Sequence, residues 1–213
     1  MELVQTANAV TERVTIPVLG GVENWKVHLK YMLQALDKQP GRLRTRWGPW
    51  TEDQQKLELI TSWINAEACE AWKKSRDFAD AMIRLAPVLG GEPSGYLLQF
   101  KPFAPQAVIN SPVVETVSFE DCREPEDKMR EMVERAAPMP GCNGVASGYS
   151  LRRSPGPGGD GGDGDAGRTF VAAIGWAGLE ASRQADKSAY TGGMKTERHH
   201  VDFNFPVKGF GGL

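Results

Sequence analysis

The chain has 213 residues, of which 40% are hydrophobic and 24% are charged, and its formal net charge at pH 7 is −2. This composition is typical of a globular protein with enough chain to bury a core, and the absence of a basic stripe argues against nucleic acid as a partner. No apolar run is long enough to span a bilayer, and residues 1–10 lack the pattern of a signal peptide.

The first half of the chain predicts the element order βαββαβ. A β-branched run predicts a strand over residues 14–19, and apolar residues at helical spacing predict a helix over residues 22–37, which Pro40-Gly41 ends. Strands are expected at 42–47 and 56–63, a second helix at 67–85 and a closing strand at 96–101.

The second half repeats this order. We expect a strand over residues 113–119, a helix over 124–137, strands over 145–152 and 168–176, a helix over 179–190 and a final strand over 199–205. A proline-rich stretch at residues 102–112 separates the two halves.

The two halves also match residue by residue. Residues 113 positions apart correspond as follows: Trp63, Glu67, Ala68, Lys74 and Ser75 match Trp176, Glu180, Ala181, Lys187 and Ser188. Upstream, Pro40-Gly41 matches Pro140-Gly141 at an offset of 100, and the difference, 113 − 100 = 13, is the length of the glycine-rich insert at residues 155–167. One loop insertion reconciles both offsets, which indicates an internal duplication.

We therefore predict an α+β fold made of two tandem ferredoxin-like βαββαβ units that form a pseudo-dimeric α+β barrel. The predicted domains are residues 10–102, a linker at 103–112 and a second repeat at 113–208. Two helices cover only one face of such a sheet, so a second copy is expected to cover the other face and to enclose an apolar space that suits a small ligand. A monomer should suffice.

The segment from Trp63 to Phe78, which reads WINAEACEAWKKSRDF, resembles the antibiotic biosynthesis monooxygenase family of the dimeric α+β barrel superfamily. The family includes cofactor-free monooxygenases that act on anthrone-type polyketides, polyketide cyclases, haem-degrading enzymes and proteins of no known activity. Trp72 matches a tryptophan of the haem-degrading members, but Met82 stands where those members carry the axial histidine, and Ala185 replaces Trp72 in the second half. The resemblance therefore implies no haem, and we expect no cofactor.

The final strand carries the candidate catalytic residues, His200 and Asp202. Alternation places His199, Val201 and Phe203 on one face and His200, Asp202 and Asn204 on the other. We expect the apolar set to pack on the helices and the polar set to face the barrel interior, where His200 could act as a general base. The alternative is that the polar set lies on a solvated rim.

Four aromatic residues and Asn204 are candidates for substrate binding. Trp72 has no counterpart in the second half, Trp47 flanks the Gly48-Pro49 turn, and Tyr96 and Tyr149 could supply hydroxyl groups. Aromatic walls suit a flat, aromatic ligand, although large aromatic residues more often serve packing.

The remaining polar clusters carry weaker indications. Arg42, Arg44 and Arg46 alternate on one strand face, which indicates either an anion site or a solvated edge strand. The aspartates of the insert, residues 160, 163 and 165, lack the spacing and closing glutamate of a calcium loop. The cysteines Cys69, Cys122 and Cys142 have no metal-ligand spacing, and their sparse, odd number favours a cytoplasmic protein.

Two functions remain open. The first is a small enzyme that performs cofactor-independent oxygenation, or an acid–base cyclisation or decarboxylation, on an aromatic or polyketide-like metabolite. The second is a ligand-binding or stress-related barrel without turnover. In both cases we expect a small hydrophobic or aromatic ligand as the partner, and neither a membrane nor nucleic acid.

Overall fold

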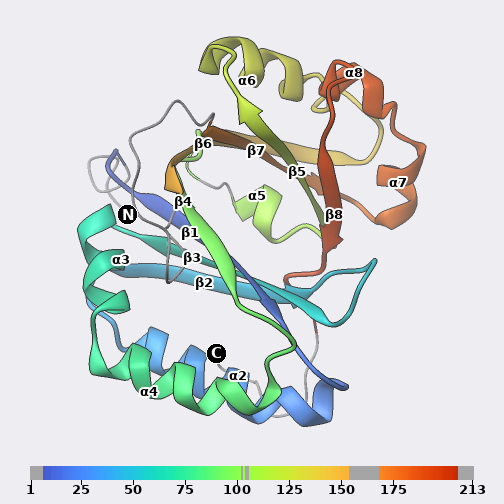
Figure 1. Cartoon of the computed structure of the whole chain (residues 1–213). Helices are drawn as coiled ribbons and strands as arrows, with labels where there is room; N and C mark the ends of the chain where they lie inside the picture. The colour runs from blue at the N-terminus through green and yellow to red at the C-terminus, as the bar shows by residue number, and fades with distance from the viewer. Residues whose placement is uncertain (1–6, 102, 104–105, 154–167, 206–213) are drawn as a thin grey trace. The chain divides into compact units, whose positions relative to one another are not determined.

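The computed structural model describes residues 7–101, 103, 106–153 and 168–205 (Figure 1). The chain forms two compact units of α+β class: unit 1 comprises Met1–Gly95 and Asn204–Leu213, and unit 2 comprises Tyr96–Phe203. The predicted α+β class, with antiparallel sheets and ferredoxin-like element order, is confirmed. The residue limits of the two repeats stay a prediction, and the glycine-rich insert with its three aspartates lies outside the described residues.

Unit 1 contains a three-stranded antiparallel sheet in the order β2-β3-β1. Its elements are β1 (Val10–Pro17), α2 (Val22–Asp37), β2 (Arg42–Pro49), β3 (Lys56–Trp63), α3 (Ala66–Lys73), α4 (Arg76–Leu85) and the 3-10 turn η1 (Ala86–Val88). Helix α2 has the predicted limits, and it buries Trp25, Leu29 and Leu36 along one stripe because these residues recur at helical spacing. Helices α2 and α4 lie together on one side of the strands (Figure 1).

Unit 2 has the sheet order β4-β6-β7-β5-β8, with every described pair antiparallel. Its elements are β4 (Ser94–Leu98), which begins in unit 1, α5 (Gln106–Ile109), β5 (Val113–Cys122), α6 (Glu126–Glu134), β6 (Cys142–Arg153), β7 (Arg168–Trp176), α7 (Leu179–Gln184), α8 (Lys187–Thr191) and β8 (Glu197–Val201). The core packs residues of α6 and α8, including Val133 and Tyr190, against Phe119, Phe170 and Ile174 of the sheet.

The short helix α5, which the sequence pattern does not predict, lies on the other face of the unit 2 sheet. A Cβ atom at Gly175 of β7 would lie 3.0 Å from the backbone of Val108 and 2.3 Å from Ser111 Oγ. Helix α5 can therefore approach β7 only because Gly175 has no side chain.

Each predicted second helix is broken in two. Ser75 accepts a hydrogen bond from Phe78 N (3.1 Å) and begins α4, and Asp186 accepts one from Ser188 N (3.0 Å) and begins α8. A side chain that caps a new helix start competes with continuation of the preceding helix, so both predictions of one long helix are wrong.

The corner that precedes β2 has the same geometry as the corner that precedes β6. Gly41 and Gly141 have φ angles of +77° and +79°, and their carbonyl oxygens accept hydrogen bonds from Ile64 N (2.8 Å) and Ala177 N (2.7 Å). A Cβ atom would lie 2.8 Å from Ala68 Cβ in unit 1 and 2.7 Å from Ala181 Cβ in unit 2. Glycine is therefore required at both corners for the same two reasons, left-handed backbone and close approach.

A β-bulge follows each corner, between Arg42 and Arg44 in β2 and between Cys142 and Gly144 in β6. Because the bulge shifts the register by one residue, Arg42 lies opposite Trp63, whereas Arg44 and Arg46 lie opposite Ser62 and Ile60. Arg42 instead forms an ion pair with Asp37 (2.5 Å). The prediction that the three arginines share one face is therefore wrong for Arg42.

The final strand is shorter than predicted, because β8 ends at Val201. The three cysteines are free thiols. Within the described part of the chain, no helix is long and apolar enough to cross a membrane.

Candidate functional site

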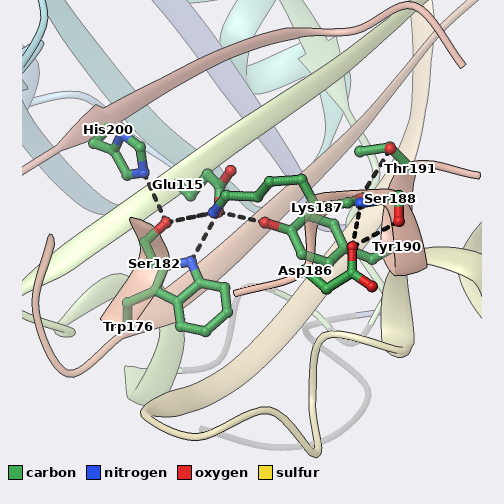
Figure 2. A network of polar contacts seen from close by, with 9 residues as sticks. All are labelled: Glu115, Trp176, Ser182, Asp186, Lys187, Ser188, Tyr190, Thr191 and His200. Atoms are coloured by element: carbon green, nitrogen blue, oxygen red, sulfur yellow. Dashed lines mark hydrogen bonds and ion pairs between the residues drawn. The ribbon is translucent and has the colours of Figure 1, made fainter. Parts of the chain in front are cut away.

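The most connected polar side chain of unit 2 is Glu115 in β5, which is fully buried. Its Oε2 atom accepts hydrogen bonds from Trp176 Nε1, Ser182 Oγ, Lys187 Nζ and Tyr190 OH, each at 3.0 Å (Figure 2). No donor among the described residues reaches Oε1. Four donors thus converge on one oxygen of the carboxyl group, which has the lone pairs to accept them.

Four elements deliver these side chains to one place. Glu115 lies opposite Ile174 of β7 and opposite His200 of β8, on the face that also carries the core residue Val117. Ser182 lies in α7, and Lys187 lies in α8. Helices α7 and α8 are short and have little helical stability of their own. The carboxylate of Glu115 therefore holds both helices against the sheet.

His200 extends the network outward through Ser182. The Ser182 Oγ atom lies 2.8 Å from His200 Nε2 and 2.8 Å from Lys187 Nζ, and the two side chains reach the hydroxyl from different sides (Figure 2). Because Ser182 donates its one hydrogen to Glu115, His200 Nε2 must donate to Ser182. His200 is then either an imidazolium ion or the tautomer whose basic nitrogen is Nδ1.

The environment of α8 shifts the pKa values of its two titratable groups, Lys187 and Tyr190, in opposite directions. Burial lowers the pKa of Lys187 and Arg198 lowers it further, although the carboxylate of Glu115 opposes both. Burial, followed by the charge of Glu115, raises the pKa of Tyr190, so its hydroxyl stays protonated at neutral pH and can donate to Glu115. The site thus holds a buried anion, a cation that releases its proton more readily than usual, and a half-buried histidine.

The predicted orientation of His200 is wrong. His200 hydrogen-bonds Ser182 of α7 and so faces a helix, whereas His199 and Val201 are buried on the opposite face. Alternation along a strand groups residues by face but does not say which face the helices cover. The buried Glu115 opposite His200 makes the helix side suitable for a polar side chain.

The other predicted residues of unit 2, Asp202, Tyr96 and Tyr149, lie on or next to β8, β4 and β6. Asp202 is half-buried just beyond the end of β8, and Tyr96 in β4 lies opposite Arg153. The hydroxyl of Tyr149 donates to the carbonyl of Glu124 (2.6 Å) and lies 3.0 Å from Cys122 Sγ. Tyr149 therefore contributes to the core, and none of these hydrogen bonds joins it to the Glu115 network.

The three remaining predicted residues belong to unit 1. Trp72 is buried and packs edge-on against Phe78 at 5.3 Å, and Trp47 packs edge-on against Trp25 (5.8 Å) and Phe205 (6.3 Å). Asn204 is exposed. Both tryptophans take part in packing, and a ligand-binding role for them stays a prediction.

Unit 1 carries a simpler counterpart of the network. Glu12 of β1 pairs with Lys73 Nζ at 3.1 Å, and Cys69 stands 113 positions before Ser182. Burial and the neighbouring Glu12 raise the pKa of the Cys69 thiol, which therefore stays neutral. The indole nitrogen of Trp63 is buried and has no hydrogen-bond partner among the described residues, whereas that of Trp176 donates to Glu115.

The sequence analysis missed Glu115, Ser182 and Lys187 as parts of one site. A signal was present: Glu115 is a lone carboxylate within the apolar, β-branched run VVETV, and such a residue requires buried partners. No group of three or more potential metal ligands occurs among the residues that the structure describes.

Comparison with known proteins identifies the fold. No protein-family model matches the sequence, and no curated protein matches it either. Among solved structures, an anthrone oxidase-like protein superposes with a TM-score of 0.65 at 11% identity, and the alignment covers 92% of each chain. A proposed monooxygenase from Fusobacterium nucleatum superposes with a TM-score of 0.60 at 13% identity and 92% coverage of each chain.

A proposed monooxygenase from Lactobacillus acidophilus gives a TM-score of 0.56 at 12% identity, covering 91% of this chain and 93% of its own. At these identities the likeness shows the fold alone. The chain is thus similar over nearly its whole length to α+β proteins of the monooxygenase type, and its fold is theirs.

Proposed function

We propose that the protein is a monooxygenase-like enzyme that oxygenates an electron-rich aromatic or polyketide-like metabolite without a cofactor, with His200 as the acid–base group. The observation that carries this proposal is the hydrogen-bonded chain from His200 through Ser182 to Glu115 and Lys187. It supports the proposal because the hydrogen bond to Ser182 holds the imidazole of His200 in one orientation, as a general base requires.

The proposed reaction balances with molecular oxygen as the oxidant. His200 removes a proton from an activated CH2 group of the substrate, and the resulting carbanion passes one electron to O2. The two radicals combine to a peroxide anion, which takes the proton back from His200. The resulting hydroperoxide loses water and leaves a carbonyl group. One oxygen atom enters the product and the other leaves as water, so each substrate consumes one O2.

We further propose that the two units arose by duplication, form the α+β barrel predicted from the sequence and act as a monomer. Three repeated features support the duplication: the glycine corners at Gly41 and Gly141, the bulge that follows each, and the carboxylates Glu12 and Glu115. Light scattering at low concentration tests the assembly, and an obligate dimer would contradict it.

A second candidate is a ligand-binding protein without turnover. Unit 1 favours it, because Glu12 and Lys73 form a similar ion pair between sheet and helix with no histidine. On this view the Glu115 network only holds α7 and α8 in place.

Oxygen uptake with anthrone as the probe distinguishes the two. We expect one O2 consumed per anthrone converted to anthraquinone, and a loss in kcat of about 100-fold or more in His200→Asn, the range of general acid–base catalysis. His28→Asn is the matched control, because His28 lies on α2 in unit 1 and contacts the carbonyl of Arg84 (2.5 Å). Native mass spectrometry on the same variants measures binding separately.

Binding without oxygen uptake, or uptake that His200→Asn leaves unchanged, would sink the proposed role of His200. The first outcome would favour the ligand-binding protein.

A further inference from the structure

We infer that Lys187 is a ligand-recognition residue of unit 2, which donates a hydrogen bond to the carbonyl oxygen of an aromatic ketone held beside His200. The inference rests on the proposed function only in placing the ligand next to His200. It goes further by naming the chemical group that is recognised and the residue that recognises it.

Lys187 keeps one hydrogen that the described residues do not use. An ammonium group has three N–H donors and no acceptor, and two donors of Lys187 reach Glu115 Oε2 (3.0 Å) and Ser182 Oγ (2.8 Å). Among the described residues, no third acceptor lies within hydrogen-bonding distance of Nζ. The ring centroids of Trp176 and Tyr190 lie further away, 5.3 Å and 5.5 Å from Nζ. A half-buried donor of this kind needs an oxygen from water or from a ligand.

The other groups that donate to Glu115 have no hydrogen left for a ligand. The indole of Trp176 and the hydroxyls of Ser182 and Tyr190 carry one N–H or O–H hydrogen each, and all three donate it to Glu115 Oε2. Ser182 also uses both of its lone pairs, for Lys187 and His200. Of the four donors around Glu115, Lys187 is thus the one that can bind an additional acceptor.

The charges around Nζ favour a neutral acceptor over an anion. The carboxylate of Glu115 lies 3.0 Å from Nζ and balances the charge of Lys187, so an anion bound there would face a second negative charge. A carbonyl oxygen accepts the hydrogen without a charge of its own, and its bond to an ammonium group is stronger than a bond between two neutral groups. Burial lowers the pKa of Lys187, and an acceptor for its third hydrogen would stabilise the charged form.

Lys187 and His200 lie close enough together to contact one ligand. Lys187 Nζ and His200 Nε2 each lie 2.8 Å from Ser182 Oγ, and they approach this buried hydroxyl from different sides (Figure 2). The side chain of Lys187 is 23% exposed and His200 is half-buried, whereas Glu115 is fully buried. A ligand that arrives from solvent therefore meets Lys187 and His200 before it meets Glu115.

This arrangement suits a ketone with an acidic CH2 group near His200. When the proposed base His200 removes a proton from that group, negative charge moves to the carbonyl oxygen, and the hydrogen bond from Lys187 becomes stronger. Lys187 then contributes to the rate of the proposed reaction as well as to binding.

Unit 1 provides a matched lysine in a different environment. Lys74 stands 113 positions before Lys187 and is exposed, and it is the neighbouring Lys73 that pairs with Glu12 (3.1 Å). Lys74→Met therefore removes the same charge from the chain and leaves the Glu115 network intact.

Tryptophan fluorescence titrations of the full chain without oxygen test the inference with anthrone and dihydroanthracene, the same ring system with a CH2 group in place of the carbonyl group. The ratio of the two affinities isolates the contribution of the carbonyl oxygen. We expect Lys187→Met to lower the ratio of anthrone affinity to dihydroanthracene affinity by about tenfold or more, because the ammonium group donates to anthrone alone. Lys74→Met and His200→Asn should leave the ratio within about twofold of the wild-type value.

Glu115→Gln combined with Lys187→Met is a second variant in case Lys187→Met alone does not fold, because it removes both charges of the ion pair and leaves neither one buried without its partner. It should lower the ratio by a similar factor. An unchanged ratio in both variants, or an equal loss in Lys74→Met, would overturn the inference. Oxygen uptake by the wild-type protein tests turnover separately: a ratio that depends on Lys187 without oxygen uptake would support recognition by Lys187 and contradict the proposed enzyme. Absence of anthrone binding would overturn both.

Discussion

Unit 1 and unit 2 share an element order, a glycine corner and a bulge, yet they differ in where polar side chains are buried. Unit 1 has the ion pair of Arg13 with Glu58 on the sheet face turned away from its helices, where Arg44 and Arg46 also lie, and a sparse polar contact beneath its helices. Unit 2 has the four-donor carboxylate beneath its helices, and small or apolar residues at the positions that match the arginines. The two units thus concentrate their buried polar contacts on different faces of their sheets, which indicates that the two faces of this fold can diverge separately.

The sharpest test of this difference is to remove the matched carboxylates. Glu115→Gln should lower the free energy of unfolding by about 3–5 kcal/mol, because it removes the charge that four donors share, Lys187 among them. Glu12→Gln should cost only about 1–2 kcal/mol, since Glu12 has fewer donors, while Lys73 and Lys187 are about equally exposed.

Urea denaturation at pH 7, followed by tryptophan fluorescence, measures both losses. Equal losses in the two variants would show that the networks are energetically the same, and the contrast between the units would fail.

The glycine corners test the opposite point, the likeness of the units. Gly41→Ala and Gly141→Ala should each cost about 2–4 kcal/mol, because alanine is strained at these φ angles by about 1–2 kcal/mol and its Cβ overlaps a neighbouring alanine.

Thermal or urea unfolding provides the measurement. Adding Ala68→Gly to Gly41→Ala should restore the part of the loss that comes from overlap, while the backbone strain remains. A large loss at one corner and none at the other would argue against a common geometry.

The smallest effect concerns alkaline pH. Tyr190 and Tyr149, both in unit 2, have raised pKa values because burial disfavours their ionised forms. The stability that each provides is complete below the ordinary pKa of 10.0 and is lost as pH rises above it, because the unfolded chain then releases a proton that the folded chain retains. Lys187, whose pKa is lowered, acts in the opposite sense up to its ordinary value of 10.5.

Tyr190→Phe should therefore reduce the loss of stability between pH 10 and pH 11 by about 1 kcal/mol. Urea titrations at both pH values, compared with wild type, give this difference directly. An unchanged slope would mean that Tyr190 ionises in the folded protein as readily as in the unfolded chain.

The sequence predicts the connectivity of this fold well, because its signals are local. Helix α2 follows from the spacing of Trp25, Leu29 and Leu36, and the correspondence of Gly41 with Gly141 is visible as an offset of 100. These features depend on periodicity and turn chemistry, which a few neighbouring residues determine.

The candidate site was predicted only in part, because it depends on partners far apart in the chain. His200 was identified, but its orientation requires knowing that Glu115 lies opposite it in the sheet and that Ser182 lies above both. The helix breaks at Ser75 and Asp186 were missed because the sequence around each also suits a continuous helix. Only the capping hydrogen bonds of these two side chains distinguish a broken helix from a continuous one.

The bulge between Arg42 and Arg44 has a consequence for how such a protein can change over time. Arg42 and Arg44 are two positions apart yet face opposite sides of the sheet, because the extra residue of the bulge lies between them. The residue that faces the helices at the start of β2 is therefore independent of the residues that follow the bulge. Substitutions at Arg44 and Arg46 can therefore accumulate without disturbing the corner. In β6 the residue after the bulge, Gly144, is instead restricted to glycine by its φ angle of +145°. Deleting the extra residue of either bulge would leave the later residues on their present faces, whereas a single-residue deletion in the regular part of the strand would turn every later side chain to the other face. The bulge is thus the one place in the strand where a change in length need not reverse the side chains that follow.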